Sequence, residues 1–160
     1  MRLPVAGATS GRYFEFPQLT AAANNSLFCD LDFTQKTISR IEACIGVGIY
    51  SIKLTYVDGT TSPLFGHRQT NVENQVANDP ATQMPIHVTA VRTQAWGQNY
   101  VQALALLGGI NHNEVLASMT SSKGKGQAEM HVIEPGARLI GIYGYQDNKG
   151  DVRGLGFLTA

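Results

Sequence analysis

The sequence predicts an all-β protein built from antiparallel sheets, and three observations indicate this fold class. Short segments in which apolar and polar residues alternate recur along the 160-residue chain, and this is the period of strands rather than of helices. Glycine, proline and asparagine turn signals separate these segments, with no internal repeat and no linker. The clearest segment is 49–56, in which Ile52, Leu54 and Tyr56 share one face and the residues between them are polar.

Length and charge indicate one domain that associates with other molecules. A chain of 160 residues, taken as a single domain over residues 1–160, is long enough to bury a core without disulfides. The 12 basic and 12 acidic side chains give a formal net charge of zero, so we expect no nucleic-acid partner. Charged residues make up 15% of the chain, against roughly 25% in an average soluble domain. A weakly charged surface favours a homo-oligomer or residence in a complex.

The first seven residues lack the apolar run of a secretory signal, and no stretch approaches the length of a transmembrane helix. We therefore expect no membrane span and favour a cytoplasmic location. Two cysteines, Cys29 and Cys44, are too few for a disulfide framework and have no zinc-site spacing. We interpret both as reduced core residues, with a disulfide between them as the alternative, and no cofactor is predicted.

The first third of the chain predicts two strands. Residues 13–16 alternate and end at a proline, which stops the strand. Residues 20–25 form either one helical turn or a loop, and 27–33 alternate again as a strand that would pair ahead of the central hairpin. Asp30 and Asp32 share a face of that strand, and an exposed sheet edge is favoured over a cation site because no third oxygen ligand has calcium-loop spacing.

The central stretch 37–66 reads as a hairpin followed by a further turn. Its two strands are joined at Gly46–Gly48, and Asp58–Gly59 supplies the positive-φ positions that a two-residue hairpin turn needs. Residues 67–85, rich in Asn, Gln and Thr, are too long for an ordinary connection and form a polar functional loop or an insertion. A helical turn over 72–77 is an alternative within it.

The second half of the chain continues as strands and turns. A strand is predicted over 86–94 and another over 100–107, where Val101, Ala103, Ala105 and Leu107 alternate and a glycine pair ends the run. Further strands are predicted at 115–120, 128–133, 137–145 and 152–157, with a loop at 108–113 and turns at 123–126, 135–136 and 147–150.

The order of these segments resembles the family of jacalin-related lectins. The run 38–66 is similar to the pattern I-x-x-I, G, I-x-x-I-x-v-x-Y-x-D-G, f-G, and 10–16 is similar to an opening glycine followed by an F-x-F strand. Residues 115–124 resemble a strand ending in T-N-K-G, and 139–144 and 152–157 resemble the last two strands. The resemblance spans most of the chain and implies a β-prism of three Greek-key antiparallel sheets. Another antiparallel sandwich or barrel is the alternative.

The resemblance also implies a sugar site at one end of the prism. In the family, the loop at the first glycine and the loop before the last strand hold the sugar, and a G-x-x-x-D pattern brings one carboxylate to its hydroxyls through charge-assisted hydrogen bonds. Here Arg153 or Gly154 stands where the family has that acid, depending on whether the pattern is anchored at the final Leu-Gly or at Gly150. Asp151 is near but is expected to point to a different side. The usual carboxylate is therefore missing.

Two functions remain open. The first is a non-catalytic carbohydrate-binding module for mannose- or galactose-type sugars, with Asp147 or Asp151 as acceptor, or with a basic rim of Arg12, Lys149 and Arg153 for a negatively charged ligand. The basic rim is the arrangement that we expect. The second is a structural or protein-interaction subunit that keeps the fold without sugar binding. The predicted rim consists of Gly11, Arg12, Asn111, His112, Asn113, Asp147, Gly150, Asp151, Val152 and Arg153.

Other chemistry receives little support. The run 123–126 lacks the helix that would present its amides to a phosphate, so a solvated hairpin is favoured. The four histidines lie singly in different segments and predict no metal site, and no nucleophile elbow predicts an enzyme. Trp96, with Tyr100 nearby, is either a sugar-stacking platform or a core residue, and the core is favoured.

Overall fold

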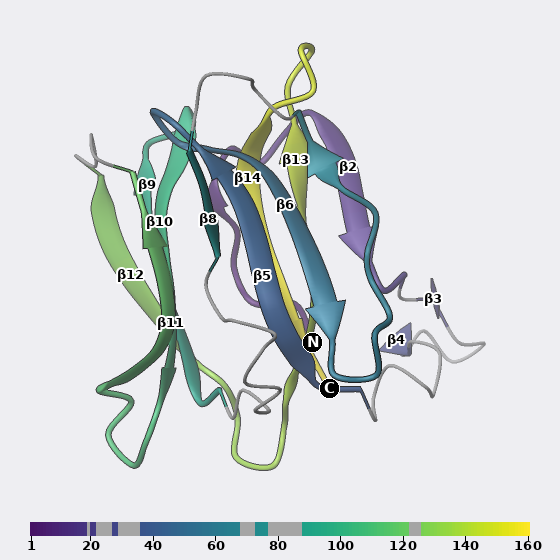
Figure 1. Cartoon of the computed structure of the whole chain (residues 1–160), viewed down its shortest axis with the longest axis vertical. Helices are drawn as coiled ribbons and strands as arrows, with labels where there is room; N and C mark the ends of the chain where they lie inside the picture. Colours follow the sequence, from purple (N-terminus) through teal and green to yellow (C-terminus); the bar gives the residue numbers. More distant parts are fainter. Residues whose placement is uncertain (19, 22–26, 29–35, 68–72, 77–87, 122–125) are drawn as a thin grey trace.

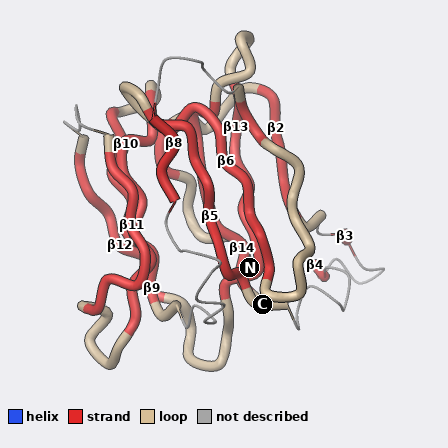
Figure 2. The backbone as a smooth tube through the Cα atoms, in the orientation of Figure 1, coloured by secondary structure: helices blue, strands red, loops and turns tan. Residues whose placement is uncertain are grey.

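Every regular element in the described part of the chain is a β-strand (Figure 2). The computed structural model describes residues 1–18, 20–21, 27–28, 36–67, 73–76, 88–121 and 126–160. The strands among these residues form three four-stranded antiparallel sheets and one two-stranded pair (Figure 1). The predicted all-β class and the β-prism architecture are confirmed.

The first sheet joins the two ends of the chain. Its order is β1-β14-β13-β2, with the long hairpin of β13 and β14 in the middle. The short strand β1 pairs with β14, and β2 pairs with β13, so that the opening residues lie on both sides of the closing hairpin. The strands are β1 Ala6–Gly7, β2 Arg12–Phe16, β13 Leu139–Gln146 and β14 Val152–Thr159.

The second sheet is built on the predicted central hairpin. Strands β5 and β6 pair in antiparallel fashion across the Gly46–Gly48 turn, and Ile52, Leu54 and Tyr56 are almost completely buried, as their alternation predicts. The sheet order is β7-β6-β5-β8. The strands are β5 Ile38–Ile45, β6 Ile49–Tyr56, β7 Phe65–Gly66 and β8 Glu73–Val76.

The third sheet has the order β11-β10-β9-β12. Its strands are β9 Ala90–Trp96, β10 Tyr100–Gly108, β11 Glu114–Thr120 and β12 Gln127–Val132. The separate pair consists of β3 Thr20–Ala21 and β4 Leu27–Phe28.

One hydrophobic core lies between the three sheets. Ile41 and Leu54 come from the second sheet, Leu104 from the third, and Leu155 and Phe157 from the first, and all are 2% exposed or less. Each such side chain contributes about 1.5–3 kcal/mol of hydrophobic stabilisation. The Tyr56 hydroxyl donates to the carbonyl of Ile140 at 2.5 Å, which ties the second sheet to the first.

The turn after β6 differs from its prediction. Only Gly59, with φ +89°, has a positive φ, and Asp58 does not. The Gly59 amide donates to the Tyr56 carbonyl, and the Tyr56 amide donates to the Thr60 carbonyl, so the connection has three residues. This is a turn that ends in a glycine bulge, and not the two-residue turn that Asp-Gly favours.

The alternation predicted for β10 is also interrupted. The strand is present, but its register with β9 shifts between Val101 and Ala103. Because the bulge adds one residue, Val101, Leu104 and Leu106 belong to the main core, whereas Ala105 and Leu107 form a separate small cluster with Ala90. Simple alternation along 101–107 therefore breaks at Gln102.

Several local expectations are corrected or lie outside the described residues. Residues 73–76 form strand β8 rather than a helical turn. Of the strand predicted over 27–33, residues 27–28 are described, and they pair as β4 with β3. The strand predicted over 86–94 begins at Ala90 and extends to Trp96.

Cys44 is a buried thiol, 1% exposed, as predicted. Cys29, Asp30, Asp32, His87, the run 123–125 and most of 67–85 lie outside the described residues. Among the described residues, no helix is long and apolar enough to cross a membrane.

Candidate functional site

The turn between β13 and β14 is organised by Asp147. Its Oδ1 accepts hydrogen bonds from the amides of Lys149 at 2.9 Å and Asp151 at 3.0 Å. Its backbone carbonyl accepts from the Gly150 amide at 3.0 Å, and Gly150 adopts φ +92°. Asp folds the chain locally in this way because its short side chain can bond to backbone amides two and four residues ahead.

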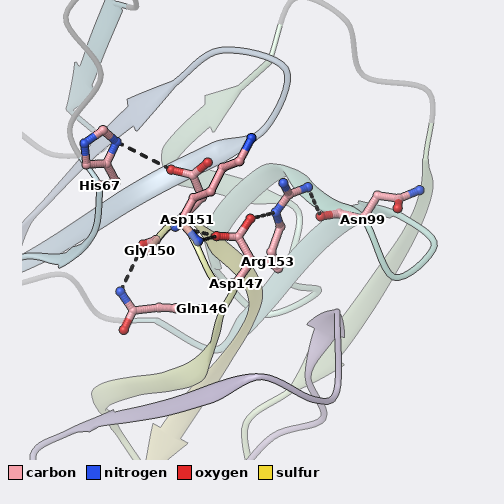
Figure 3. A network of polar contacts seen from close by, with 8 residues as sticks. His67, Asn99, Gln146, Asp147, Gly150, Asp151 and Arg153 are labelled. Carbon is pink, nitrogen blue, oxygen red and sulfur yellow. Dashed lines mark hydrogen bonds and ion pairs between the residues drawn. The ribbon is translucent and has the colours of Figure 1, made fainter.

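Arg153, the second residue of strand β14, completes this network (Figure 3). Its Nε donates to Asp147 Oδ2 at 2.7 Å, and its Nη1 donates to the Asn99 carbonyl at 3.0 Å. The guanidinium carbon lies 3.8 Å from the centre of the Tyr100 ring, a cation–π contact. Arg153 therefore ties the last turn to the turn between β9 and β10, and its charge is balanced by Asp147.

The pKa of Asp147 reflects these contacts. Burial opposes ionisation of the carboxyl group, but hydrogen bonds from Arg153 and from the amides of Asp151 and Lys149 hold its pKa below the ordinary value. The group is therefore an ionised acceptor that is already used inside the protein. Its side chain remains 24% exposed.

Asp151, the other acid of this turn, is buried at 5% exposure. Among the described residues, its Oδ1 has no hydrogen-bond partner, and His67 Nδ1 lies 3.8 Å away. The His67 side chain is 61% exposed. Figure 3 shows the two side chains pointing toward one another, on the side of the turn away from Arg153. A buried Asp151 is not a surface acceptor for a ligand.

Gly154 occupies one of the two positions where the family pattern would have its acid, and the fold closes this position. Strand β1 runs alongside, with Gly7 opposite Gly154. A Cβ at Gly154 would lie 2.0 Å from the carbonyl oxygen of Ala8. No side chain fits there without displacing the backbone at Ala8, which directly follows β1, so the carboxylate cannot simply be restored at this position.

Gly11 and Arg12 are brought to the same end of the molecule as the turn. Arg12 is the partner of Gln146 in the β2–β13 ladder, and a Cβ on Gly11, at φ +129°, would lie 2.5 Å from the Gln146 carbonyl oxygen. Both Gly11 and Arg12 are exposed. The two loops that the resemblance assigns to the sugar thus lie side by side. Val152, the first residue of β14, is fully buried.

The loop 111–113 is not part of this end. Strand β10 runs its full nine residues from the 97–99 turn to this loop, a distance of about 26 Å. Figure 1 shows the β10–β11 connection at the opposite end from the β13–β14 turn. His112 has φ +56° and its Nδ1 lies 2.8 Å from Thr89 Oγ1. The predicted rim therefore divides into two separate groups.

Trp96 is exposed, contrary to the prediction that it belongs to the core. It is 48% exposed at the end of β9. Tyr100 is half-buried, with its ring under Arg153 and edge-on to Tyr50. Sequence reasoning missed the parts played by Asn99 and Tyr100 in holding Arg153, and no local sequence signal pointed to them. Among the described residues, no group of three or more potential metal ligands lies together.

Comparison with known proteins finds similarity in structure but not in sequence. No protein-family model matches the sequence, and no curated protein matches it. A mannose-specific jacalin-related lectin from Morus nigra, in complex with mannose, superposes with a TM-score of 0.63 at 13% identity, over 100% of this chain and 94% of that chain. The artocarpin–mannotriose complex gives 0.62 at 12% identity, over 100% and 97%. A prostate-specific WGA16 glycoprotein lectin gives 0.58 at 20% identity, over 98% of each chain. The resemblance read from the sequence holds for the fold, and this chain has the β-prism fold of the jacalin-related lectins.

Proposed function

We propose that this domain is a non-catalytic carbohydrate-binding module with an atypical sugar site. The observation that supports the proposal is the junction of two loops at one end of the prism, where Gly11 and Arg12 lie beside the turn 147–150. These are the loops that the lectin pattern assigns to the sugar. Solved lectins of the same fold include complexes with mannose and mannotriose, so mannose-type sugars are the first candidates and galactose-type sugars the second.

The chemistry at the 147–150 turn and the adjoining residues Gly11 and Arg12, together called the tip, predicts weak binding of sugars. A carboxylate offers about four acceptor positions, and Asp147 already uses three of them for Lys149, Asp151 and Arg153. One position remains for a sugar hydroxyl, and the other contacts would be neutral. Because neutral hydrogen bonds contribute only about 0.5–1.5 kcal/mol each, we expect a monosaccharide dissociation constant on the order of 1 mM.

Arg153 is a weaker candidate than expected for the rim charge that would meet an acidic ligand. Its guanidinium already donates to Asp147 and to the Asn99 carbonyl and lies over the Tyr100 ring, which leaves only part of its N–H donors for a ligand. Of the other two cations predicted for the rim, Arg12 and Lys149, both are exposed. Replacing Arg153 would disturb the turn itself, and exposed residues are therefore the better probes of ligand contact.

A structural or protein-interaction subunit is the second candidate function. The observation that favours it is the internal use of the acids at this end: Asp147 is held by the turn, and Asp151 is buried. The closed position at Gly154 points the same way. In this case the fold persists as a scaffold and its surface meets another protein.

The test combines a glycan array with calorimetric titration of two matched variants. Asn148→Ala and Asn111→Ala are the same substitution at exposed positions at opposite ends of the molecule. We expect mannose- or galactose-type glycans to bind, with Asn148→Ala weakening the interaction and Asn111→Ala leaving it unchanged. An equal loss for both variants would contradict a site at the 147–150 turn. If the folded protein binds no glycan on the array, the result would favour the structural or protein-interaction function.

A further inference from the structure

Asp151 carries a buried carboxylate that the turn before it does not use. Its side chain is 7% exposed, and its Oδ1 has no hydrogen-bond partner among the described residues. Asp147, in contrast, engages both of its carboxylate oxygens, one with backbone amides and one with Arg153. A buried carboxylate oxygen without a partner costs free energy, and such an atom in a native protein indicates a ligand or an ion. Asp151 Oδ1 is therefore a candidate ligand-binding atom.

His67 faces this oxygen from another sheet. It directly follows β7 of the second sheet, and its Nδ1 lies 3.8 Å from Asp151 Oδ1, which is too far for a hydrogen bond. Figure 3 shows the two side chains pointing toward one another, on the side of the turn away from Arg153. Because the His67 side chain is 61% exposed, the pair can be approached from solvent on the histidine side.

The backbone holds these two groups close together. Gly66 adopts φ +95°, and a Cβ on it would lie 2.1 Å from the Tyr50 carbonyl oxygen and 2.9 Å from Val152 Cγ2. The His67 amide donates to the same carbonyl at 3.1 Å. A Cβ on Gly150 would lie 3.9 Å from His67 Cβ. The end of β7 is thus packed against the start of β14, and the imidazole and the carboxylate are brought together without a hydrogen bond between them.

An imidazole nitrogen and a carboxylate oxygen are ligands that Zn²⁺ takes in proteins, with Zn–N of roughly 2.0–2.1 Å and Zn–O of roughly 2.0–2.2 Å. An ion bonded to both atoms holds them at most about 4.3 Å apart, and about 3.4 Å apart at the tetrahedral angle. The observed 3.8 Å lies between these limits, so the exposed His67 ring needs to move only slightly to admit an ion. Mg²⁺ and Ca²⁺ prefer sites made of oxygen ligands alone.

We propose that this pair binds a divalent transition-metal ion of the zinc class, with His67 Nδ1 and Asp151 Oδ1 as its two protein ligands and water in the remaining positions. Among the described residues, no third histidine, cysteine or acid joins the pair. The site is therefore open, and it binds more weakly than a structural site with four protein ligands. A bound ion gives the buried carboxylate a partner and connects the second sheet to the first. The metal site is independent of the proposed carbohydrate-binding function.

A second histidine–carboxylate pair provides an internal control. His131 Nε2 lies 3.6 Å from Glu129 Oε2 on strand β12, a similar spacing, but the Glu129 side chain is 65% exposed. An exposed glutamate is well solvated and loses side-chain freedom when it binds an ion. Asp151 is already fixed by burial. We therefore expect zinc to prefer the His67–Asp151 pair.

The test is calorimetric titration of the metal-free protein with zinc chloride at about pH 7.5, where an unperturbed imidazole is neutral. The variants are His67→Ala, Asp151→Asn and His131→Ala, and magnesium chloride is the comparison ion. We expect His67→Ala and Asp151→Asn each to weaken zinc binding about tenfold or more, and His131→Ala to leave it unchanged. Magnesium should give no binding. Zinc binding by the wild type should also weaken at about pH 5.5, because a protonated imidazole cannot coordinate a metal.

Three results would overturn the metal site. The first is a wild type that binds no zinc, and the second is zinc binding that His67→Ala leaves intact. The third is a loss with His131→Ala that equals or exceeds the loss with His67→Ala, which would assign the ion to β12. His67 is exposed, so His67→Ala should fold and decides the question even if the buried change Asp151→Asn disturbs the fold. A thermal melt of each metal-free variant checks folding before the titration.

Discussion

Asp147 explains why the candidate sugar site of this protein is unlike the pattern it resembles. The carboxylate accepts two backbone amides and one guanidinium, so it holds the turn and has little capacity left for a ligand. The resemblance read from the sequence predicts Arg153 or Gly154 in place of the usual acid. The sequence was not sufficient to show that Arg153 points back to Asp147, because this depends on Asn99 and Tyr100, more than fifty residues away along the chain.

Asp147→Asn should remove the negative charge of this residue but keep its ability to accept the backbone amides of the turn. The amide oxygen can still accept from the Lys149 and Asp151 amides, but the ion pair with Arg153 is lost. Both side chains are about three-quarters buried, and loss of one charge-assisted hydrogen bond should lower the free energy of unfolding by about 2 kcal/mol at pH 7. Chemical denaturation measures this difference. Glu134→Gln, an exposed change with the same effect on net charge, is the control and should cost less than about 0.5 kcal/mol.

The same pair of proteins should differ in pH dependence. The pKa of Asp147 is lowered in the folded state, so its contribution to stability is present above the ordinary value of about 3.9 and is lost as the pH falls through the folded pKa. The stability difference between wild type and Asp147→Asn should therefore be constant from about pH 7 to pH 5 and shrink below about pH 4. A difference that stays constant down to pH 3 would contradict the lowered pKa.

Cys44 provides a second test at the scale of a single residue. Its side chain is buried in β5 at 1% exposure, so a thiol reagent should reach it only when the protein opens. In a Cys29→Ser variant, we expect slow labelling of the native protein and one reactive thiol after denaturation without reductant. Rapid native labelling would show that Cys44 is accessible. In the wild type, no thiol after denaturation would reveal a disulfide instead.

At the scale of elements, the hairpins were predictable and the irregularities within them were not. Alternation placed β6 correctly because every second residue from Ile52 to Tyr56 enters the core. The same reasoning failed in β10, where a bulge at Gln102 exchanges the two faces. Nothing in the local sequence marks this bulge, since Gln102 is held by groups from other elements: its Nε2 donates to the Val47 carbonyl and its Oε1 accepts from the Gly126 amide.

The turn after β6 gives a prediction about one glycine. Gly59 adopts φ +89° and has no other atom within 4 Å of a Cβ built on it, so any cost of substitution comes from backbone conformation and not from a clash. Gly59→Val should lower the free energy of unfolding by more than about 1 kcal/mol, because a β-branched residue is strained at positive φ. Gly59→Asn is the matched control and should cost less, since Asn tolerates this region. Equal melting temperatures for the two variants would refute the turn geometry.

At the scale of the whole molecule, the order of segments was the most informative property of the sequence. Each strand pattern alone is common to many antiparallel folds, but their order and spacing agreed with a three-sheet prism, and the structure has that arrangement. The division of the predicted rim could not be foreseen, because the side of the prism on which a loop emerges depends on strand direction in the assembled sheets. Residues 111–113 lie at the opposite end of β10 from the turn that Arg153 contacts.

Self-association remains a prediction, and the third sheet offers the surface for it. Strand β12 is an edge strand with most of its residues exposed, including Met130 at 49% and Val132 at 47%. An exposed edge strand can pair with the same strand of a second molecule. The formal net charge of zero and the calculated isoelectric point near 6.9 mean that little repulsion opposes this at neutral pH.

Val132→Lys should therefore reduce self-association at pH 7. Lysine on an edge strand places a charge against its counterpart in the paired molecule, and this like-charge contact disfavours the dimer. Val57→Lys is the matched control, because Val57 is also 47% exposed and the substitution changes net charge equally, but it lies in the turn after β6. Sedimentation velocity over a concentration series should show a dimer for the wild type and Val57→Lys, and a shift toward monomer for Val132→Lys. An equal shift for both lysines would indicate a general charge effect, and a wild type that stays monomeric at all concentrations would show that the edge of β12 is not used for pairing.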